Sequence, residues 1–145
     1  MSKKLKPNPR YEWRVYDRKA HRYYEHAERG IERHTPHGSQ PYSFANLIND
    51  PHFVLEQNTT FTDQNQQPIF EGDLIDVQHT RYLSVVQWIN VHGCWQLKIH
   101  ADHLPGYHYF TLANIDAAEM HICGNCHDQA EALQMTKYQW QRLNL

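Results

Sequence analysis

Alternating apolar and polar residues dominate the middle of the chain and predict a strand-rich body. Runs rich in β-branched and aromatic residues mark six expected strands, at residues 53–61, 68–70, 74–78, 82–89, 95–99 and 107–112. Gly93 and the Pro105-Gly106 pair supply turn residues between them. Strands of this length and spacing are typical of small barrels and sandwiches. We therefore predict a mainly β fold (all-β or α+β), with a partly open barrel over residues 53–123.

The segments before this body carry weaker signals. Residues 11–16 alternate aromatic or aliphatic positions with polar ones and predict a strand. Residues 43–48 predict a short helix, because Ser43 can cap its first turn and Pro51 disfavours helix at the residue before it. Residues 29–42 hold two Gly and two Pro among polar side chains, so we predict a loop there and expect it to be the most mobile internal segment.

The last part of the chain predicts a helix over residues 129–143. Asp128 and Glu131 have the spacing of a capping box, in which two side chains satisfy the free N–H groups of the first helical turn. Four apolar residues then fall near one helical face: Ala130, Leu133, Trp140 and Leu143.

Length and composition narrow the class of protein. The 145 residues fit one domain with a sizeable core. The sequence has no run of about eighteen apolar residues and no apolar stretch near its start, so we expect no membrane span and no signal peptide. We therefore place the protein in the cytoplasm, where its three Cys are expected to be free thiols.

Charge is unevenly distributed along the chain, although the net charge is only −2. Residues 1–33 hold ten Lys and Arg against five Asp and Glu, a charge of +5, whereas residues 34–145 hold four against eleven, a charge of −7. Two interpretations are open at this point. Either the opposite charges partly neutralise each other within the fold, or one of the charged regions binds a partner, as a basic arm that contacts phosphates or as an acidic face that engages a basic protein.

The most distinctive motif joins Asp63 and Asn65 to the run Ile69-Phe70-Glu71-Gly72-Asp73, as a polar turn, a short strand and a Gly turn. This stretch resembles the signature of the YopX family of small phage and prophage proteins, which has Asp-x-Asn-Gly followed by Ile-Tyr-Glu-Gly-Asp. Three further blocks resemble the family in the same order: Trp13-Arg14-Val15-Tyr16-Asp17, Val85-Val86-Gln87-Trp88 and Cys123-Gly124-Asn125-Cys126-His127-Asp128. The chain departs from the family pattern at Gln66, where the family has the turn Gly, and at two Cys that replace aliphatic residues.

The resemblance implies a mainly β domain over residues 10–135. A disordered basic arm at residues 1–9 would precede it, and a chain-specific extension at residues 136–145 would follow. The resemblance brings no catalytic residues. It implies structural roles for the motif residues Asp63, Asn65, Glu71, Gly72, Asp73, Trp88, Gly124 and Asn125. Gly72 lies between two predicted strands and is expected to take a backbone conformation that other residues resist.

A cluster of possible metal ligands lies near the end of the predicted barrel. His121, Cys123, Cys126 and His127 fall within seven residues and offer the thiolate and imidazole groups that zinc prefers. A structural zinc site usually takes ligands from a second segment, which could be Cys94, His100, His103 or His108. The favoured alternative is that both Cys are small buried hydrophobic residues, in which case no cofactor is expected.

Other chemistry finds less support in the sequence. The Cys-x-x-Cys-His pattern also occurs in c-type haem attachment and in redox motifs, but this chain shows no export signal and no βαβ pattern. We rank both below zinc. The twelve His are scattered, and the chain has no His-Glu-x-x-His, P-loop or Gly-x-Ser-x-Gly motif. We therefore expect the protein not to be an enzyme.

Three functions stay open on this basis. The favoured one is a non-catalytic phage or prophage accessory protein that binds a host or phage protein in the host cytoplasm, with interference in host defence as one form. The second is a nucleic-acid-binding barrel that stacks bases on aromatic residues, which the low net charge disfavours. The third is a zinc or redox protein centred on residues 121–127. A homo-oligomer is compatible with each, and membrane association is expected for none.

Overall fold

A computed structural model describes residues 12–99 and 109–143 of the chain. The chain divides into two compact units, Met1–Asn58 (unit 1) and Thr59–Leu145 (unit 2). The boundary falls inside a long strand, β5 (Phe53–Thr62). The basic arm predicted at residues 1–9 and the turn predicted at Pro105-Gly106 lie outside the described residues.

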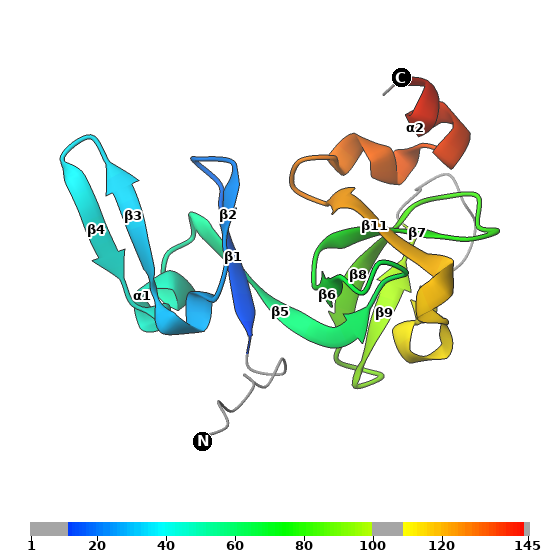
Figure 1. Cartoon of the computed structure of the whole chain (residues 1–145), viewed down its shortest axis with the longest axis horizontal. Coiled ribbons are helices and arrows are strands. Elements are labelled where there is room, and N and C mark those ends of the chain that lie inside the picture. The colour runs from blue at the N-terminus through cyan, green and yellow to red at the C-terminus, as the bar shows by residue number, and fades with distance from the viewer. Residues whose placement is uncertain (1–11, 100–108, 144–145) are drawn as a thin grey trace, which may run out of the picture. The chain divides into compact units, whose positions relative to one another are not determined.

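Unit 1 is built around the antiparallel strand β1, which pairs with β2 on one side and with the first part of β5 on the other. The elements that precede β5 are β1 (Trp13–Asp17), β2 (Arg22–Tyr24), the 3₁₀ helix η2 (Ala27–Arg29), β3 (Ile31–Thr35), β4 (Gly38–Tyr42) and α1 (Phe44–Asn49) (Figure 1). Val15, Leu47 and Phe53 lie buried in the apolar cluster of this unit. The strand predicted over residues 11–16 is confirmed as β1.

The loop predicted over residues 29–42 is wrong, because this segment forms the β3–β4 hairpin. Ile31 is buried in the cluster of unit 1, and Tyr42, which pairs with it, packs its ring 5.7 Å from that of Phe53. Gly38 adopts φ 111 at the start of β4, a conformation that favours Gly. Gly30 precedes this hairpin, Pro36 and Gly38 lie at its turn, and Pro41 lies within β4, whereas β3 itself alternates between more buried and more exposed residues.

The short helix predicted over residues 43–48 is confirmed as α1. The Ser43 hydroxyl accepts a hydrogen bond from the Asn46 backbone N–H at 3.1 Å, as expected of an N-cap. Asp50, the residue before Pro51, is already extended, with φ −102 and ψ 114.

Unit 2 contains a five-stranded antiparallel sheet with the order β10-β9-β8-β7-β11, curved into a half-barrel. Its strands are β7 (Asp73–Val77), β8 (Ser84–Ile89), β9 (Cys94–Lys98), β10 (Tyr109–Thr111) and β11 (Met120–Asn125), and the short β6 (Pro68–Phe70) pairs with β5. The predicted mainly β fold with a partly open barrel is therefore confirmed. Gly93 adopts φ 60 between β8 and β9, as the predicted hairpin turn requires.

Aliphatic side chains fill the inner face of this sheet. The buried cluster consists of Ile69, Ile75, Val77, Val86, Leu97, Leu112 and Met120. Three 3₁₀ helices connect the strands or follow them: η3 (Leu112–Asn114), η4 (Ala117–Glu119) and η5 (Ala130–Gln134). No helix within the described ranges is long and apolar enough to cross a membrane.

The predicted C-terminal helix is present in two pieces, because the chain forms η5 and then α2 (Lys137–Leu143). The capping box predicted at Asp128 and Glu131 is wrong, since η5 begins without a side-chain cap. The reciprocal pair lies instead at Thr136 and Gln139, where each side chain accepts a hydrogen bond from the other residue's backbone N–H. Figure 1 shows both pieces beside β11, where Ala132, Leu133 and Trp140 join a second apolar cluster with Leu74, Leu83 and Val85.

Candidate functional site

The first motif turn is organised by the carboxylate of Asp63, which is only 2% exposed. One oxygen accepts hydrogen bonds from the backbone N–H groups of Asn65 (2.9 Å) and Gln67 (3.0 Å), and the other from that of Ile122 (3.1 Å). Burial opposes ionisation of this carboxyl, but the three hydrogen bonds and nearby His121 hold its pKa below the usual value. Asp63 therefore joins the turn to β11, and both of its carboxylate oxygens accept hydrogen bonds from the backbone.

The second motif turn, which includes Glu71, is also structural. Gly72 has φ 85, which confirms the predicted need for Gly, and its N–H donates to the Val86 carbonyl at 2.9 Å. The buried carboxylate of Asp73 accepts from the Phe70 backbone N–H at 2.8 Å. Asp73 and Gly72 therefore stabilise a tight turn between β6 and β7.

The third motif block turns the chain out of β11. The Asn125 side-chain oxygen accepts from the backbone N–H groups of His127 (3.0 Å) and Asp128 (2.9 Å). The Asn125 backbone N–H donates to the side chain of Gln129 at 2.9 Å. A Cβ atom at Gly124 would lie 2.4 Å from the same Gln129 oxygen, so Gly leaves room for this bond. The side chains of Asn125 and Gln129 therefore accept hydrogen bonds from backbone groups of the same segment.

Trp88 differs from the other motif residues, because its large apolar side chain is exposed. It lies opposite Trp95 across β8 and β9, and the two rings meet edge to face at 5.2 Å. Phe110 lies opposite Leu97 in the neighbouring pair of strands. Since Leu97 is two residues from Trp95, these side chains project from the same face of the sheet.

This face passes from the interior of unit 2 to its surface. Leu97 is fully buried and Trp95 packs against the inner cluster, whereas Trp88 and Phe110 are 44% and 41% exposed. We call Trp88, Trp95 and Phe110 the aromatic face. Exposed aromatic side chains that extend a packed core are typical of contact surfaces for partners.

Comparison with known proteins identifies the family. The family model described as "YopX protein" matches residues 12–134. The chain belongs to the YopX family. The resemblance found in the sequence is thereby confirmed, and the match spans most of both compact units.

Two solved structures share the fold of this YopX-family protein. The chain superposes on protein EF1440 from Enterococcus faecalis with a TM-score of 0.53 and 17% identity, covering 84% of this chain and 96% of that one. It superposes on protein yopX from Bacillus subtilis with a TM-score of 0.53 and 12% identity, covering 85% and 98%. No curated protein sequence matches the chain significantly.

The four predicted zinc ligands are only partly brought together. The sulfur of Cys126 and a ring nitrogen of His127 lie within 4.8 Å of each other. Within residues 12–99 and 109–143, neither His121 nor Cys123 joins this pair at such spacing. Cys126 packs instead on the second apolar cluster of unit 2, as the alternative of a small hydrophobic residue implies. His100, His103 and His108 lie outside the described residues.

Cys123 was expected to be buried, and this expectation is wrong. The residue is exposed because it occupies a β-bulge: Ile122 pairs with Ile75 and Gly124 with Leu74, which leaves Cys123 without a partner residue. Its sulfur nevertheless turns toward the sheet and lies 3.5 Å from the Leu74 carbonyl oxygen. Desolvation of the sulfur and the nearby carboxylates raise the pKa of this thiol to about 11, which disfavours the reactive thiolate.

The zinc hypothesis remains a prediction, and replacing both Cys residues tests it. We expect a variant carrying Cys123→Val and Cys126→Val to stay folded, and the unmodified protein to hold no stoichiometric metal by elemental analysis. About one zinc per chain, lost in the double variant together with a lower melting temperature on chelation, would contradict this expectation.

Proposed function

We propose that this YopX-family protein is a non-catalytic accessory protein of a phage or prophage that binds another protein in the host cytoplasm. The observation that carries the proposal is the aromatic face, where Trp88 and Phe110 are exposed beside the partly buried Trp95. Trp is among the residues that contribute most to binding energy at protein interfaces, through packing into apolar pockets of a partner.

The chemistry of the motif residues supports a binding role over a catalytic one. The acids Asp63 and Asp73 accept hydrogen bonds from backbone N–H groups. Cys123 has a raised pKa, so its thiol is poorly suited to nucleophilic attack. The two acids therefore support the fold, whereas the motif residue Trp88 lies on the aromatic face and is available to contact a partner.

Charge favours a protein partner over a nucleic acid. Unit 2 holds four Lys and Arg against nine Asp and Glu, a charge of −5. A phosphate backbone would be repelled by this excess, whereas a partner with basic residues around an apolar pocket would be attracted. One form of this activity is interference with a host defence nuclease, whose basic groove an acidic surface can occupy.

Affinity purification from bacterial lysate with matched variants tests the proposal. Trp88→Ala and Phe110→Ala should each lose a partner that the unmodified chain retains. Ile48→Ala removes a comparably exposed apolar side chain from unit 1 (59% exposed) and should retain it. Equal retention by all variants would show that binding does not use the aromatic face, and a homogeneous dimer in light scattering that Trp88→Ala dissolves would identify a second copy as the partner.

A nucleic-acid partner is a separate outcome of the same design. Aromatic side chains on a half-barrel can stack bases, so fluorescence polarisation with labelled single strands belongs in the comparison. Tight binding at physiological salt that Trp88→Ala abolishes would contradict the protein-binding proposal and support the nucleic-acid alternative.

A further inference from the structure

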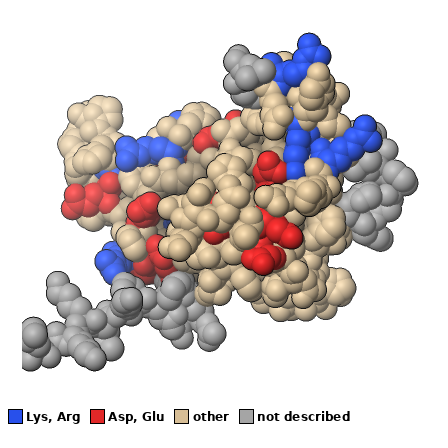
Figure 2. All heavy atoms as spheres, turned by 45° about the vertical axis from the view of Figure 1, so that its right-hand side comes forward, with Lys and Arg blue, Asp and Glu red and all other residues tan. Residues whose placement is uncertain are grey.

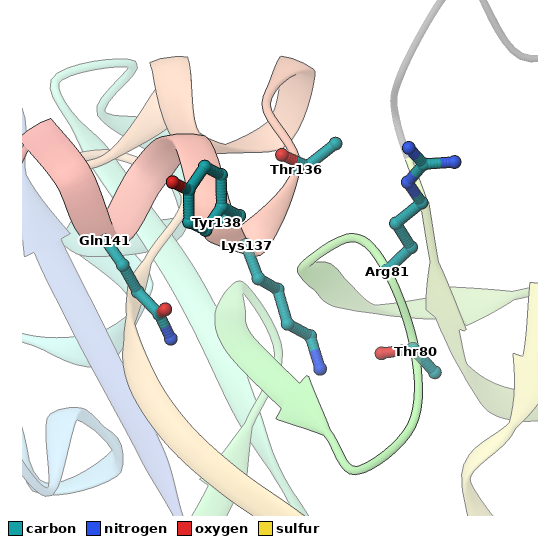
Figure 3. A pocket seen from close by; sticks show the side chains of 6 residues that line it. All are labelled: Thr80, Arg81, Thr136, Lys137, Tyr138 and Gln141. Carbon is teal, nitrogen blue, oxygen red and sulfur yellow. The ribbon is translucent and has the colours of Figure 1, made fainter.

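An open pocket of about 530 Å³ lies between α2 and the loop that joins β7 to β8. Its lining residues are Thr80, Arg81, Thr136, Lys137, Tyr138 and Gln141. Figure 3 shows Lys137, Tyr138 and Gln141 projecting from the helix, with Thr80 and Arg81 on the loop across from them. This volume is within the usual range for small-molecule sites, about 300–1,000 Å³.

The two walls of the pocket are joined by backbone hydrogen bonds. The Lys137 backbone N–H donates to the Arg81 carbonyl at 3.0 Å, and Thr136 forms a β-bridge with Tyr82. The Lys137 ammonium donates to the Val77 carbonyl at 2.6 Å and forms an ion pair with Asp76. The backbones of the two walls are therefore held together before a ligand binds, which lowers the entropic cost of assembling the site.

Positive charge gathers around this pocket in an otherwise acidic unit. Of the four Lys and Arg in unit 2, Arg81 and Lys137 line the pocket, and Arg142 stacks on the ring of Tyr138 at 5.7 Å. Figure 2 shows Lys and Arg side chains gathered at the end of unit 2 that carries α2. Asp76 offsets the charge of Lys137, whereas Arg81 forms no ion pair with an acid among residues 12–99 and 109–143.

The pocket also holds hydrogen-bond donors that the fold does not use. Among the described residues, the side chains of Arg81, Tyr138 and Gln141 form no hydrogen bond or ion pair. The Thr136 hydroxyl accepts from the Gln139 backbone, which leaves its own proton for another acceptor. A guanidinium fork with hydroxyl and amide donors around it matches the several acceptor oxygens of a phosphate group better than the two of a carboxylate.

We propose that this pocket binds a small phosphate-bearing ligand, with Arg81 as the principal contact to the phosphate. The helix that forms one wall begins at Lys137, beyond the family match, which ends at residue 134. One wall of the site therefore lies beyond the family match, whereas Arg81 on the other wall lies within it, and none of the lining residues belongs to the aromatic face.

Chemical-shift titration of the ¹⁵N-labelled full chain tests this site, with inorganic phosphate and adenosine monophosphate as probes. Saturable shifts should be confined to the amides of residues 80–81 and 136–141. Arg81→Gln should weaken binding of both probes by about tenfold or more, since it removes a charge-assisted hydrogen-bond donor. Lys98→Gln makes the same change in net charge on β9 and should leave binding unchanged.

Several results would overturn the proposal. Chloride at equal ionic strength must not reproduce the shifts, and acetate binding as tightly as phosphate would contradict the choice of phosphate. Equal shifts around Lys98 and Arg81 would indicate nonspecific anion contact. The titration of the unmodified chain is also a test by itself: the absence of saturable shifts at residues 80–81 and 136–141 would contradict the proposal even if Arg81→Gln failed to fold.

Discussion

The two compact units of this chain are stabilised by different kinds of interaction. Unit 1 combines a small apolar cluster with buried ion pairs and cation–π contacts: Arg14 lies 3.0 Å from Glu56 and stacks on Tyr23 at 4.2 Å. Unit 2 has an inner cluster of aliphatic side chains and a motif turn centred on Asp63. Unit 1 should therefore respond to the loss of single charges, and unit 2 to the loss of buried volume and of turn hydrogen bonds.

This difference follows the distribution of charge. Unit 1 holds ten Lys and Arg against seven Asp and Glu, whereas unit 2 is acidic. Arg33 shows how unit 1 uses its cations, since it lies 3.6 Å from the buried carboxylate of Asp17 and 5.4 Å from the ring of Phe53. The basic N-terminal part of the chain is thus partly neutralised within its own unit.

The largest effect is expected from Leu97→Ala in unit 2. Leu97 is fully buried in the inner cluster, so truncation leaves a cavity and should lower the free energy of unfolding by about 3 kcal/mol. Urea denaturation measures the change, with Leu143→Ala, at a residue 66% exposed, as the control. A loss below about 1 kcal/mol would show that the cluster is loosely packed.

The next effect concerns Asp63, whose pKa is held below its usual value in the folded protein. A lowered folded pKa contributes stability above the unfolded pKa of about 4, and this contribution is lost as the pH falls through the folded pKa. Asp63→Asn replaces one carboxylate oxygen with an NH₂ group, which cannot accept a hydrogen bond from a backbone N–H such as that of Ile122. The substitution should lower the free energy of unfolding by about 2 kcal/mol at neutral pH.

Urea unfolding between pH 7 and pH 3 checks this prediction. The Asp63→Asn variant should lose less stability on acidification than the unmodified chain does, because the titrating group is gone. Glu119→Gln removes an exposed carboxyl from the same unit and serves as the control. Parallel acid profiles for Asp63→Asn and the unmodified chain would argue against the lowered pKa.

In unit 1, Arg14→Met removes the arginine that pairs with the nearly buried carboxylate of Glu56, and should lower the free energy of unfolding by about 1.5 kcal/mol. This cost is smaller than for a fully buried ion pair, because the Arg14 side chain is 14% exposed. Adding Glu56→Leu should recover much of this loss, since two apolar residues then replace the pair. The exposed Arg18→Met is the control. If the double variant is less stable than Arg14→Met, the loss of the arginine charge beside the Glu56 carboxylate is not the cause.

The smallest effect has the opposite sign. Gln66 adopts φ 61 in the Asp63 turn, at the position where the family has Gly. Gln66→Gly relieves this left-handed conformation and should stabilise the protein by about 0.5 kcal/mol, because part of the gain is lost to the flexibility of Gly in the unfolded chain. Thermal unfolding checks this prediction, with Gln64→Gly as the control. Gln66→Gly should raise the melting temperature, and Gln64→Gly should not.

The sequence by itself determined the features that depend on neighbouring residues. The positive φ at Gly72 and Gly93, the Ser43 cap and most of the strands in unit 2 follow from local backbone preferences and from side-chain alternation. The family followed from the same turn motifs, because their residues are needed to form the turns. The β3–β4 hairpin could also have been found, from the alternation in residues 31–35.

Only the tertiary structure decided the features that depend on distant segments. The bulge that exposes Cys123 is a mismatch in pairing between β11 and β7, which no local pattern encodes. The pocket exists because Lys137 reaches back to β7, 60 residues away in sequence. The exposure of Trp88 likewise depends on where the sheet ends, so its place at the surface became known only with its cross-strand neighbours.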